Sequence, residues 1–154
     1  MQTITESIMC IASRLERIAD QHIFRHIDLS AISVKILFII HIHPSITPSD
    51  IQESVGGTKS NISQRLNYLE KKGFITRTHT KDADKRTVSL TLTPIGKKKI
   101  TTIKKWLTKA NLHLEKHFTQ KELHTHFDFL KKLHTVLDHE EKNHSHKLYT
   151  CKKI

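Results

Sequence analysis

Glycine and proline are scarce in this 154-residue chain, with four and three copies respectively. A composition so poor in both residues argues against a loop-rich or many-stranded fold and favours long helices. The two cysteines, Cys10 and Cys151, lie near opposite ends and form no disulfide or metal spacing. The longest apolar stretch, Ile36 to Ile40, is far shorter than the roughly 18 residues of a membrane span. Because the polar N-terminus predicts no secretory signal, we expect a cytoplasmic protein that does not interact with membranes.

Positive charge is concentrated in one segment of the chain. The net charge is +11, and residues 58–105 hold 13 basic and three acidic side chains, against four and six in residues 1–57. A basic face confined to one segment is the footprint of a polyanion partner, whereas a merely solvated surface would spread the charge more evenly. Because no phosphate loop, nucleophile elbow or pair of converging carboxylates is recognisable, we expect neither an enzyme nor a bound cofactor.

Two helices are predicted before the first proline. The first is amphipathic, with a narrow apolar seam of the kind that packs on another helix, formed by Ile4, Ile8, Ile11, Leu15 and Ile18. The second is predicted over residues 29–41 from its dense isoleucines and leucine.

Thr47 and Pro48 then predict a short helix, which ends at Gly56-Gly57. Another helix is predicted from Thr58 to a left-handed cap at Gly73, so the pair forms a helix-turn-helix.

Two β-strands are predicted after this pair. Residues 74–78 and 87–92 are rich in β-branched side chains, and residues 81–86 between them predict a charged hairpin tip. A helix-turn-helix followed by such a hairpin is a winged helix.

The remaining chain predicts two helices and a tail. One helix starts at Thr93-Pro94 and runs to about His117, and Thr119 with Glu122 predicts the capping box of the last helix. The predicted fold class is mainly α (α+β), a winged helix-turn-helix with N- and C-terminal dimerisation helices. We assign residues 1–28 and 94–142 to a dimerisation region, 29–93 to a DNA-binding domain and 143–154 to a flexible tail.

Two segments resemble the MarR family of bacterial regulators. Residues 69–77, Leu-Glu-Lys-Lys-Gly-Phe-Ile-Thr-Arg, are similar to the family's recognition-helix end, and Asp84-Lys85-Arg86 through Thr93 to Gly96 resembles its wing and strand. The resemblance implies an obligate homodimer formed by the terminal helices. It also implies recognition helices in successive major grooves and wings in the flanking minor grooves. Lys85 and Gln64 stand where the family often has arginine.

The polar face of the helix over residues 58–72 is the predicted reading surface. Its buried stripe places Ser60, Gln64 and Asn67 on the opposite side, with Asn61 beside them. Such a helix presents its N-terminal part to base edges, where Asn and Gln can pair bidentately with adenine. The alternative is an ordinary solvated surface.

Phosphate contacts are predicted around this surface. Thr58 and Lys59 lie at a helix N-terminus that favours phosphate, and Arg65 lies on the flank, where we expect phosphate instead of a base. On the hairpin we expect Lys81, Lys85 and Arg86 to contact DNA, the adjacent pair through the minor groove. Asp84 is predicted to brace a neighbouring basic side chain.

Thirteen histidines and Cys10 invite sensing hypotheses. His113 and His117 are spaced four residues apart on one predicted helix, but the even spread of histidine favours solvated side chains over a metal site. A buried Cys10, acting as a small hydrophobic residue, is favoured over a redox sensor.

The sequence therefore predicts a sequence-specific DNA-binding repressor that acts as a homodimer on double-stranded DNA, with a small-molecule effector left open. The alternatives are an architectural or RNA-binding winged helix and a metal-sensing regulator. Weak discrimination among duplexes, or a preference for RNA, would favour the former.

Overall fold

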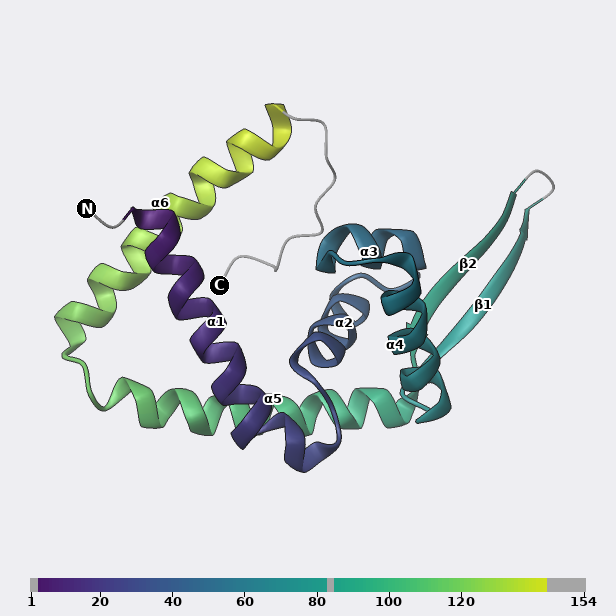
Figure 1. The fold of residues 1–154 in the computed structure, drawn as a ribbon, viewed down its shortest axis with the longest axis horizontal. Coiled ribbons are helices and arrows are strands. Elements are labelled where there is room, and N and C mark those ends of the chain that lie inside the picture. The colour runs from purple at the N-terminus through teal and green to yellow at the C-terminus, as the bar shows by residue number, and fades with distance from the viewer. Residues whose placement is uncertain (1–2, 83–84, 144–154) are drawn as a thin grey trace.

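The computed structural model describes residues 3–82 and 85–143. Its elements follow one another as a helical arm, a central winged helix and two long helices (Figure 1). Their bounds are α1 Ile4–His22, the 3-10 helix η1 Phe24–Ile27, α2 Ala31–Ile42, α3 Pro48–Val55, α4 Lys59–Lys71, β1 Ile75–Asp82, β2 Lys85–Leu92, α5 Pro94–Glu115 and α6 Gln120–Asn143. This architecture confirms the predicted mainly α winged helix.

Threonine side chains begin most of the helices. Thr47, Thr58, Thr93 and Thr119 each accept a hydrogen bond from the backbone N–H three residues further along. Such a bond satisfies a donor that has no partner inside the helix. The predicted starts of α3, α4, α5 and α6 are therefore confirmed. At the other end of α4, Gly73 has a φ of 71°, which fits the predicted left-handed cap.

The core is centred on α2. Its fully buried side chains Ile36, Leu37 and Ile40 belong to one cluster with side chains from α3, α4, β2 and α5. Because α2 is surrounded by other elements of the core, its sequence is apolar on nearly every side. The same cluster includes Phe24 from η1 and Ile100 from α5, so the core joins the segments on both sides of the winged helix.

Close packing fixes how α5 leaves the hairpin. A Cβ built at Gly96 would lie 2.0 Å from the carbonyl oxygen of Phe74, so only glycine fits this first turn of α5. Thr93 strengthens the junction because its hydroxyl donates to the carbonyl of Gly73 over 2.5 Å. The base of the wing is therefore held firmly on the core.

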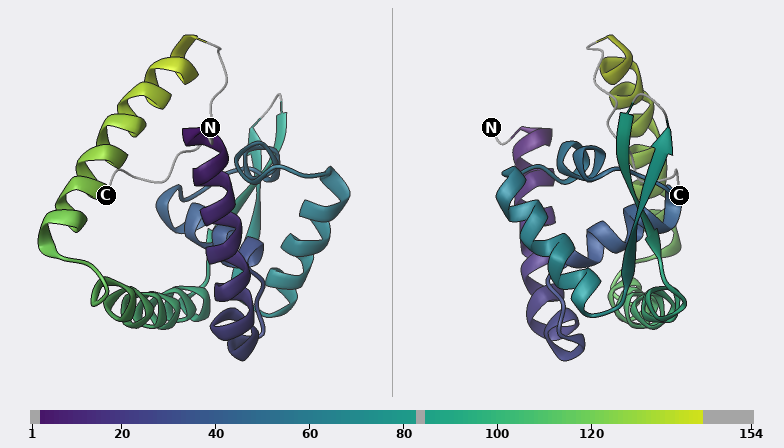
Figure 2. Two further views of the ribbon diagram at one scale, coloured as in Figure 1. Left: turned by 60° about the vertical axis from the view of Figure 1, so that its left-hand side comes forward. Right: turned by 90° about the vertical axis from the view of Figure 1, so that its right-hand side faces the viewer.

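The hairpin is longer than the sequence predicted. Its antiparallel ladder runs from Ile75↔Leu92 to Asp82↔Lys85, so the prediction that all of residues 81–86 form the tip was wrong. The ladder is made by main-chain N–H and C=O groups, so charged side chains do not have to end it. Asp84 lies outside the described residues. The ribbon projects away from the helices (Figure 1), and Figure 2 shows its two strands from two further sides.

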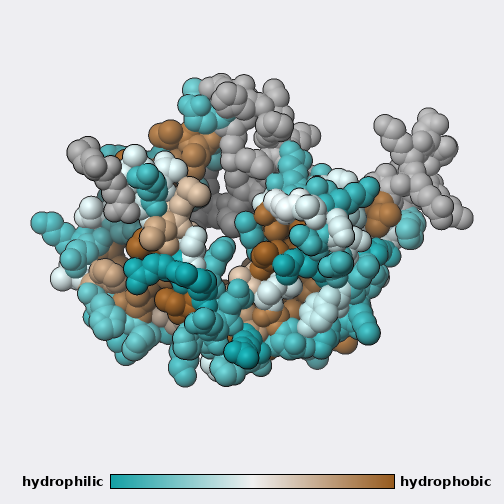
Figure 3. Space-filling model, in the orientation of Figure 1, coloured by the Kyte–Doolittle hydropathy of each residue, from teal (hydrophilic) through white to brown (hydrophobic). Residues whose placement is uncertain are grey.

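The terminal helices leave much apolar surface uncovered. Large side chains of α1 and α6 are exposed, and hydrophobic residues appear over these helices in the left half of Figure 3. The α1 helix ends at His22, four residues beyond the predicted seam, while α5 ends at Glu115 instead of His117. The 3-10 helix η1 was not predicted. Within the described part of the chain, every helix is too short or too polar to cross a membrane.

Candidate nucleic-acid interface

The α4 helix separates its apolar and polar residues as predicted. Ile62, Leu66 and Leu69 are buried in the core, while four polar residues are exposed: Ser60, Asn61, Gln64 and Asn67. The hydroxyl of Thr58 caps the helix by accepting from the N–H of Asn61, and Lys59 is exposed beside it. The N-terminal half of α4 therefore presents amide and hydroxyl groups on a rigid support.

Asn67 is held by a side chain from the wing. Arg77 on β1 donates to the Asn67 Oδ1 over 2.7 Å and lies 3.4 Å from the carboxylate of Glu70. The Nε of Arg77 is buried and has no hydrogen-bond partner among the described residues. Asn67 is therefore less free to contact a partner than its exposed position on α4 predicts. The signal for Arg77 was present in the sequence, because β1 alternation places it on the same face as buried Ile75.

The ladder of the wing places its charged residues opposite one another. Lys81 pairs with Arg86, and Asp82 pairs with Lys85. These four backbones form the outer part of the ribbon, beyond the core (Figure 2). The predicted bracing role of Asp84 falls outside the described residues.

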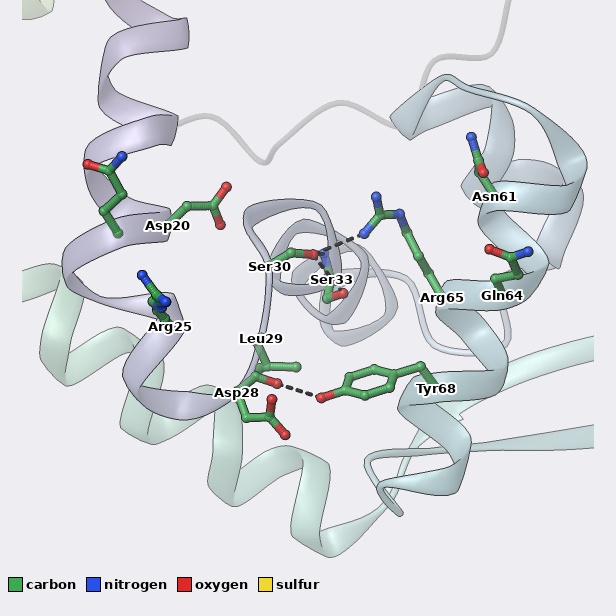
Figure 4. A pocket seen from close by; sticks show the side chains of 11 residues that line it. Asp20, Arg25, Asp28, Leu29, Ser30, Ser33, Asn61, Gln64, Arg65 and Tyr68 are labelled. Carbon is green, nitrogen blue, oxygen red and sulfur yellow. Dashed lines mark hydrogen bonds between the residues drawn. The ribbon is translucent and has the colours of Figure 1, made fainter.

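A cavity of about 670 Å³ adjoins the reading surface (Figure 4). It lies between the end of α1, the start of α2 and α4, and its lining residues other than Leu29 are of polar or charged types. Asn61, Gln64 and Arg65 of the predicted site line it. Arg65 is half-buried and its Nη1 donates to the Ser30 hydroxyl over 3.0 Å. Arg65, which we expected to contact phosphate from the flank of α4, therefore already contacts another side chain of the protein.

Three groups at one edge of this cavity influence one another. The hydrogen bond from Lys72 holds the pKa of the Asp28 carboxyl below its ordinary value, and the same contact raises the pKa of Lys72. Desolvation is the main cause of the raised pKa of Tyr68, whose hydroxyl donates to the Asp28 carbonyl over 2.7 Å. Sequence reasoning missed Tyr68 and Lys72, because their partner is about 40 residues away.

The sensing candidates lie away from this surface. Cys10 is exposed on α1, a helix that contributes no buried residue within the described chain, so the prediction that it is buried was wrong. The rings of His113 and His117 meet edge to face with centroids 5.7 Å apart. Among residues 3–82 and 85–143, no three His, Cys, Asp or Glu side chains are grouped closely enough for a metal ion.

Comparisons with known proteins agree with this architecture. The MarR family model matches residues 29–88. An uncharacterized HTH-type transcriptional regulator of Bacillus subtilis, YfiV, is 38% identical over 72 residues, which span 47% of this chain and 44% of that relative. Apo MarR from E. coli has a TM-score of 0.78 at 22% identity, covering 86% of this chain and 98% of its own. FabT of Streptococcus pneumoniae, solved in complex with DNA, has a TM-score of 0.68 at 24% identity and covers 88% and 95%.

Proposed function

We propose that this chain, whose residues 29–88 match the MarR family model, is a sequence-specific duplex-DNA-binding transcriptional repressor that acts as a homodimer. In this proposal α4 enters the major groove and the β1–β2 wing follows the minor groove. The observation that carries it is the polar N-terminal half of α4, held on a buried apolar stripe next to a basic ribbon. The similarity to YfiV, an uncharacterized HTH-type transcriptional regulator, and to FabT, solved in complex with DNA, supports the same assignment.

Chemistry and position assign roles to the reading residues. Ser60, Asn61 and Gln64 are exposed and carry the hydroxyl and amide groups that pair with base edges. Thr58 and Lys59 lie at the N-terminus of α4, where free N–H groups and a positive dipole favour phosphate. Lys81, Lys85 and Arg86 lie along the outer wing, and we assign them to the DNA backbone and minor groove.

The uncovered helices support the homodimer. Ile11 and Leu15 on α1 are 54% and 49% exposed, and Phe127 and Leu137 on α6 are 47% and 48% exposed. Seams of this kind on two long helices are costly to leave in water. A second copy of the chain would cover them through a two-fold interface, which would also place two wings and two α4 helices along one duplex.

A mobility-shift assay on the DNA upstream of the protein's own gene, with excess nonspecific competitor, tests the proposal. Changing Gln64 to Ala should weaken operator binding by roughly 1–3 kcal/mol and relax the preference at one position of each half-site. Gln120→Ala on α6 makes the same chemical change on an exposed residue and should have no effect. Equal loss of affinity on operator and random DNA would demote Gln64 to a backbone contact.

The same assay distinguishes the alternatives. An architectural protein would bind competitor and operator alike, and an RNA-binding protein would bind a matched RNA duplex or single strand more tightly. The absence of enzymatic activity is part of this proposal, as the family consists of regulators.

The cavity beside α4 supports regulation by a small-molecule effector. It has room for a small polar molecule and is lined by Arg25, Arg65 and Ser33 as well as by Gln64 of the reading surface. Occupation of this space would therefore act directly on α4. Screening of polar metabolites by thermal shift, followed by operator release, tests it; a ligand that stabilises the protein without weakening DNA binding would contradict this role.

A further inference from the structure

The arm that carries α1 joins the winged helix through residues 28–30. Asp28 lies in the left-handed region with a φ of 55°, and Leu29 next to it is buried in the core. Asp20 of α1 accepts a hydrogen bond from the N–H of Ala31 over 2.5 Å, so the end of the arm is tied to the start of α2. We call residues 28–30 the hinge segment, because they connect the arm to the start of α2.

The α4 helix contacts this hinge segment at three points. The Arg65 Nη1 donates to the hydroxyl of Ser30 over 3.0 Å, and the Tyr68 hydroxyl donates to the carbonyl of Asp28 over 2.7 Å (Figure 4). The Lys72 ammonium lies 2.5 Å from the Asp28 carboxylate. We call these three α4 residues the latch.

The spacing of the latch residues places them on one face of α4. Steps of three and four residues return to the same side of a helix, so Arg65, Tyr68 and Lys72 form a row that faces the hinge segment. This row is distinct from the buried stripe of Ile62, Leu66 and Leu69, and towards the N-terminus it continues to Asn61 of the reading surface, which lines the same cavity. The helix is thus held by apolar packing on one side and by polar contacts to the arm on another.

Two kinds of contact support α4, and they do different things. Apolar packing on α2 and α3 holds the helix on its own winged helix but is non-directional. Hydrogen bonds are directional, and they orient α4 against the hinge segment, whose Leu29 also packs in the shared core. A cavity otherwise lies between the end of α1 and α4, so the latch spans the gap at its edge.

We propose that Tyr68, Lys72 and Arg65 are positioning residues that transmit the angle of the arm to the reading helix and so set the half-site spacing that a dimer accepts. This inference rests on the proposed function for its effect on DNA. Its mechanical part, that the latch fixes α4 relative to α1, is independent of any DNA partner. Arg65 is left unchanged in the tests, since it is also a candidate phosphate contact.

Spin labels test the mechanical part. Nitroxides at Arg17→Cys on α1 and Ser60→Cys on α4 are placed in a Cys10→Ser, Cys151→Ser chain and diluted with unlabelled protein, so that the distance within one chain is measured. The double variant Tyr68→Phe, Lys72→Gln should broaden this distance distribution at least about twofold, as expected when a hinge loses its directional contacts. Lys71→Gln, which removes the same charge from the neighbouring exposed residue, should leave the distribution unchanged. An unchanged distribution in the double variant would overturn the latch.

Duplexes with different spacers between half-sites test its consequence. Loss of the two contacts should lower affinity at the best spacing about three- to tenfold, the range expected for lost hydrogen bonds, while flattening the penalty for added base pairs. General destabilisation would lower affinity at every spacing equally, and that result would also overturn the inference. If the wild-type protein binds no duplex specifically, the proposed function fails, and the spin-label distances still decide the latch.

Discussion

Truncation of the apolar seam of α1 should separate the protomers without unfolding the winged helix. The perturbation is the double change of Ile11 and Leu15 to Ala, at two of the exposed positions of the seam. Alanine keeps α1 helical because it has the highest helix propensity. In the described chain α1 contributes no buried residue, so these side chains have little to lose within their own protomer.

The magnitude follows from their exposure. Complete burial of an Ile or Leu side chain contributes about 1.5–3 kcal/mol, and about half of each residue is still exposed. Covering each would therefore contribute about 1 kcal/mol in each protomer. A two-fold interface counts both residues twice, so the double variant should lose about 4 kcal/mol of dimer stability, which is roughly a thousandfold in the dimer Kd.

Light scattering over a concentration series measures this change. The wild type should have about twice the chain mass of 17.9 kDa, and the variant should approach the single mass at low micromolar concentration. Glu16→Ala with Arg17→Ala removes two exposed residues from the polar side of α1 and should leave the dimer intact. A wild-type monomer that binds DNA tightly, or a double variant that stays dimeric, would refute the reasoning.

Three further predictions concern the wing, the core and the latch. Arg86→Ala should weaken binding to all duplexes and reduce the slope of log K against log salt by about 0.9 per protomer. The control Lys121→Ala on α6 should change neither affinity nor slope. An unchanged slope for Arg86→Ala would mean that the wing does not contact DNA. Gly96→Ala should lower the free energy of unfolding by about 3 kcal/mol, because the added Cβ meets the Phe74 carbonyl. Thermal melting measures this change, with Lys97→Ala as the control. A melting curve of Gly96→Ala that matches the wild type would show that α5 can shift to make room. A carbon-13 titration should find the Asp28 pKa below its ordinary 3.8, and Lys72→Gln should raise it. The stability contributed by this pair is present above that ordinary value and is lost as the pH falls through the lowered pKa, so an unmoved Asp28 titration in the variant would argue against the pair.

Local chemistry made most of the fold predictable. Thr47, Thr58 and Thr93 mark helix starts through bonds to residues three positions away, so the sequence alone indicates them. The polar face of α4 follows in the same way from its apolar stripe. The MarR resemblance made the assembly of these elements predictable as well.

Features that depend on distant parts of the chain were not predictable. The exposure of Cys10 depends on what packs against α1. The spacing of apolar residues predicts an amphipathic helix, but it does not indicate whether the same chain or another chain packs against it. The contact of Arg65 with Ser30 joins residues 35 positions apart, and the latch to Asp28 spans still more of the chain. The length of the wing follows from backbone pairing, and the charged side chains within residues 81–86 do not predict that pairing.

Selection of bound duplexes from a random library by the purified full chain tests the central claim most directly. A dimeric reader of duplex DNA should enrich an inverted repeat whose half-sites are centred about one helical turn, 10–10.5 base pairs, apart. The same selection with Gln64→Ala should relax one position in each half-site and keep the repeat. A library that gains no motif after repeated rounds, or a single unrepeated half-site, would contradict a dimeric reader of duplex DNA.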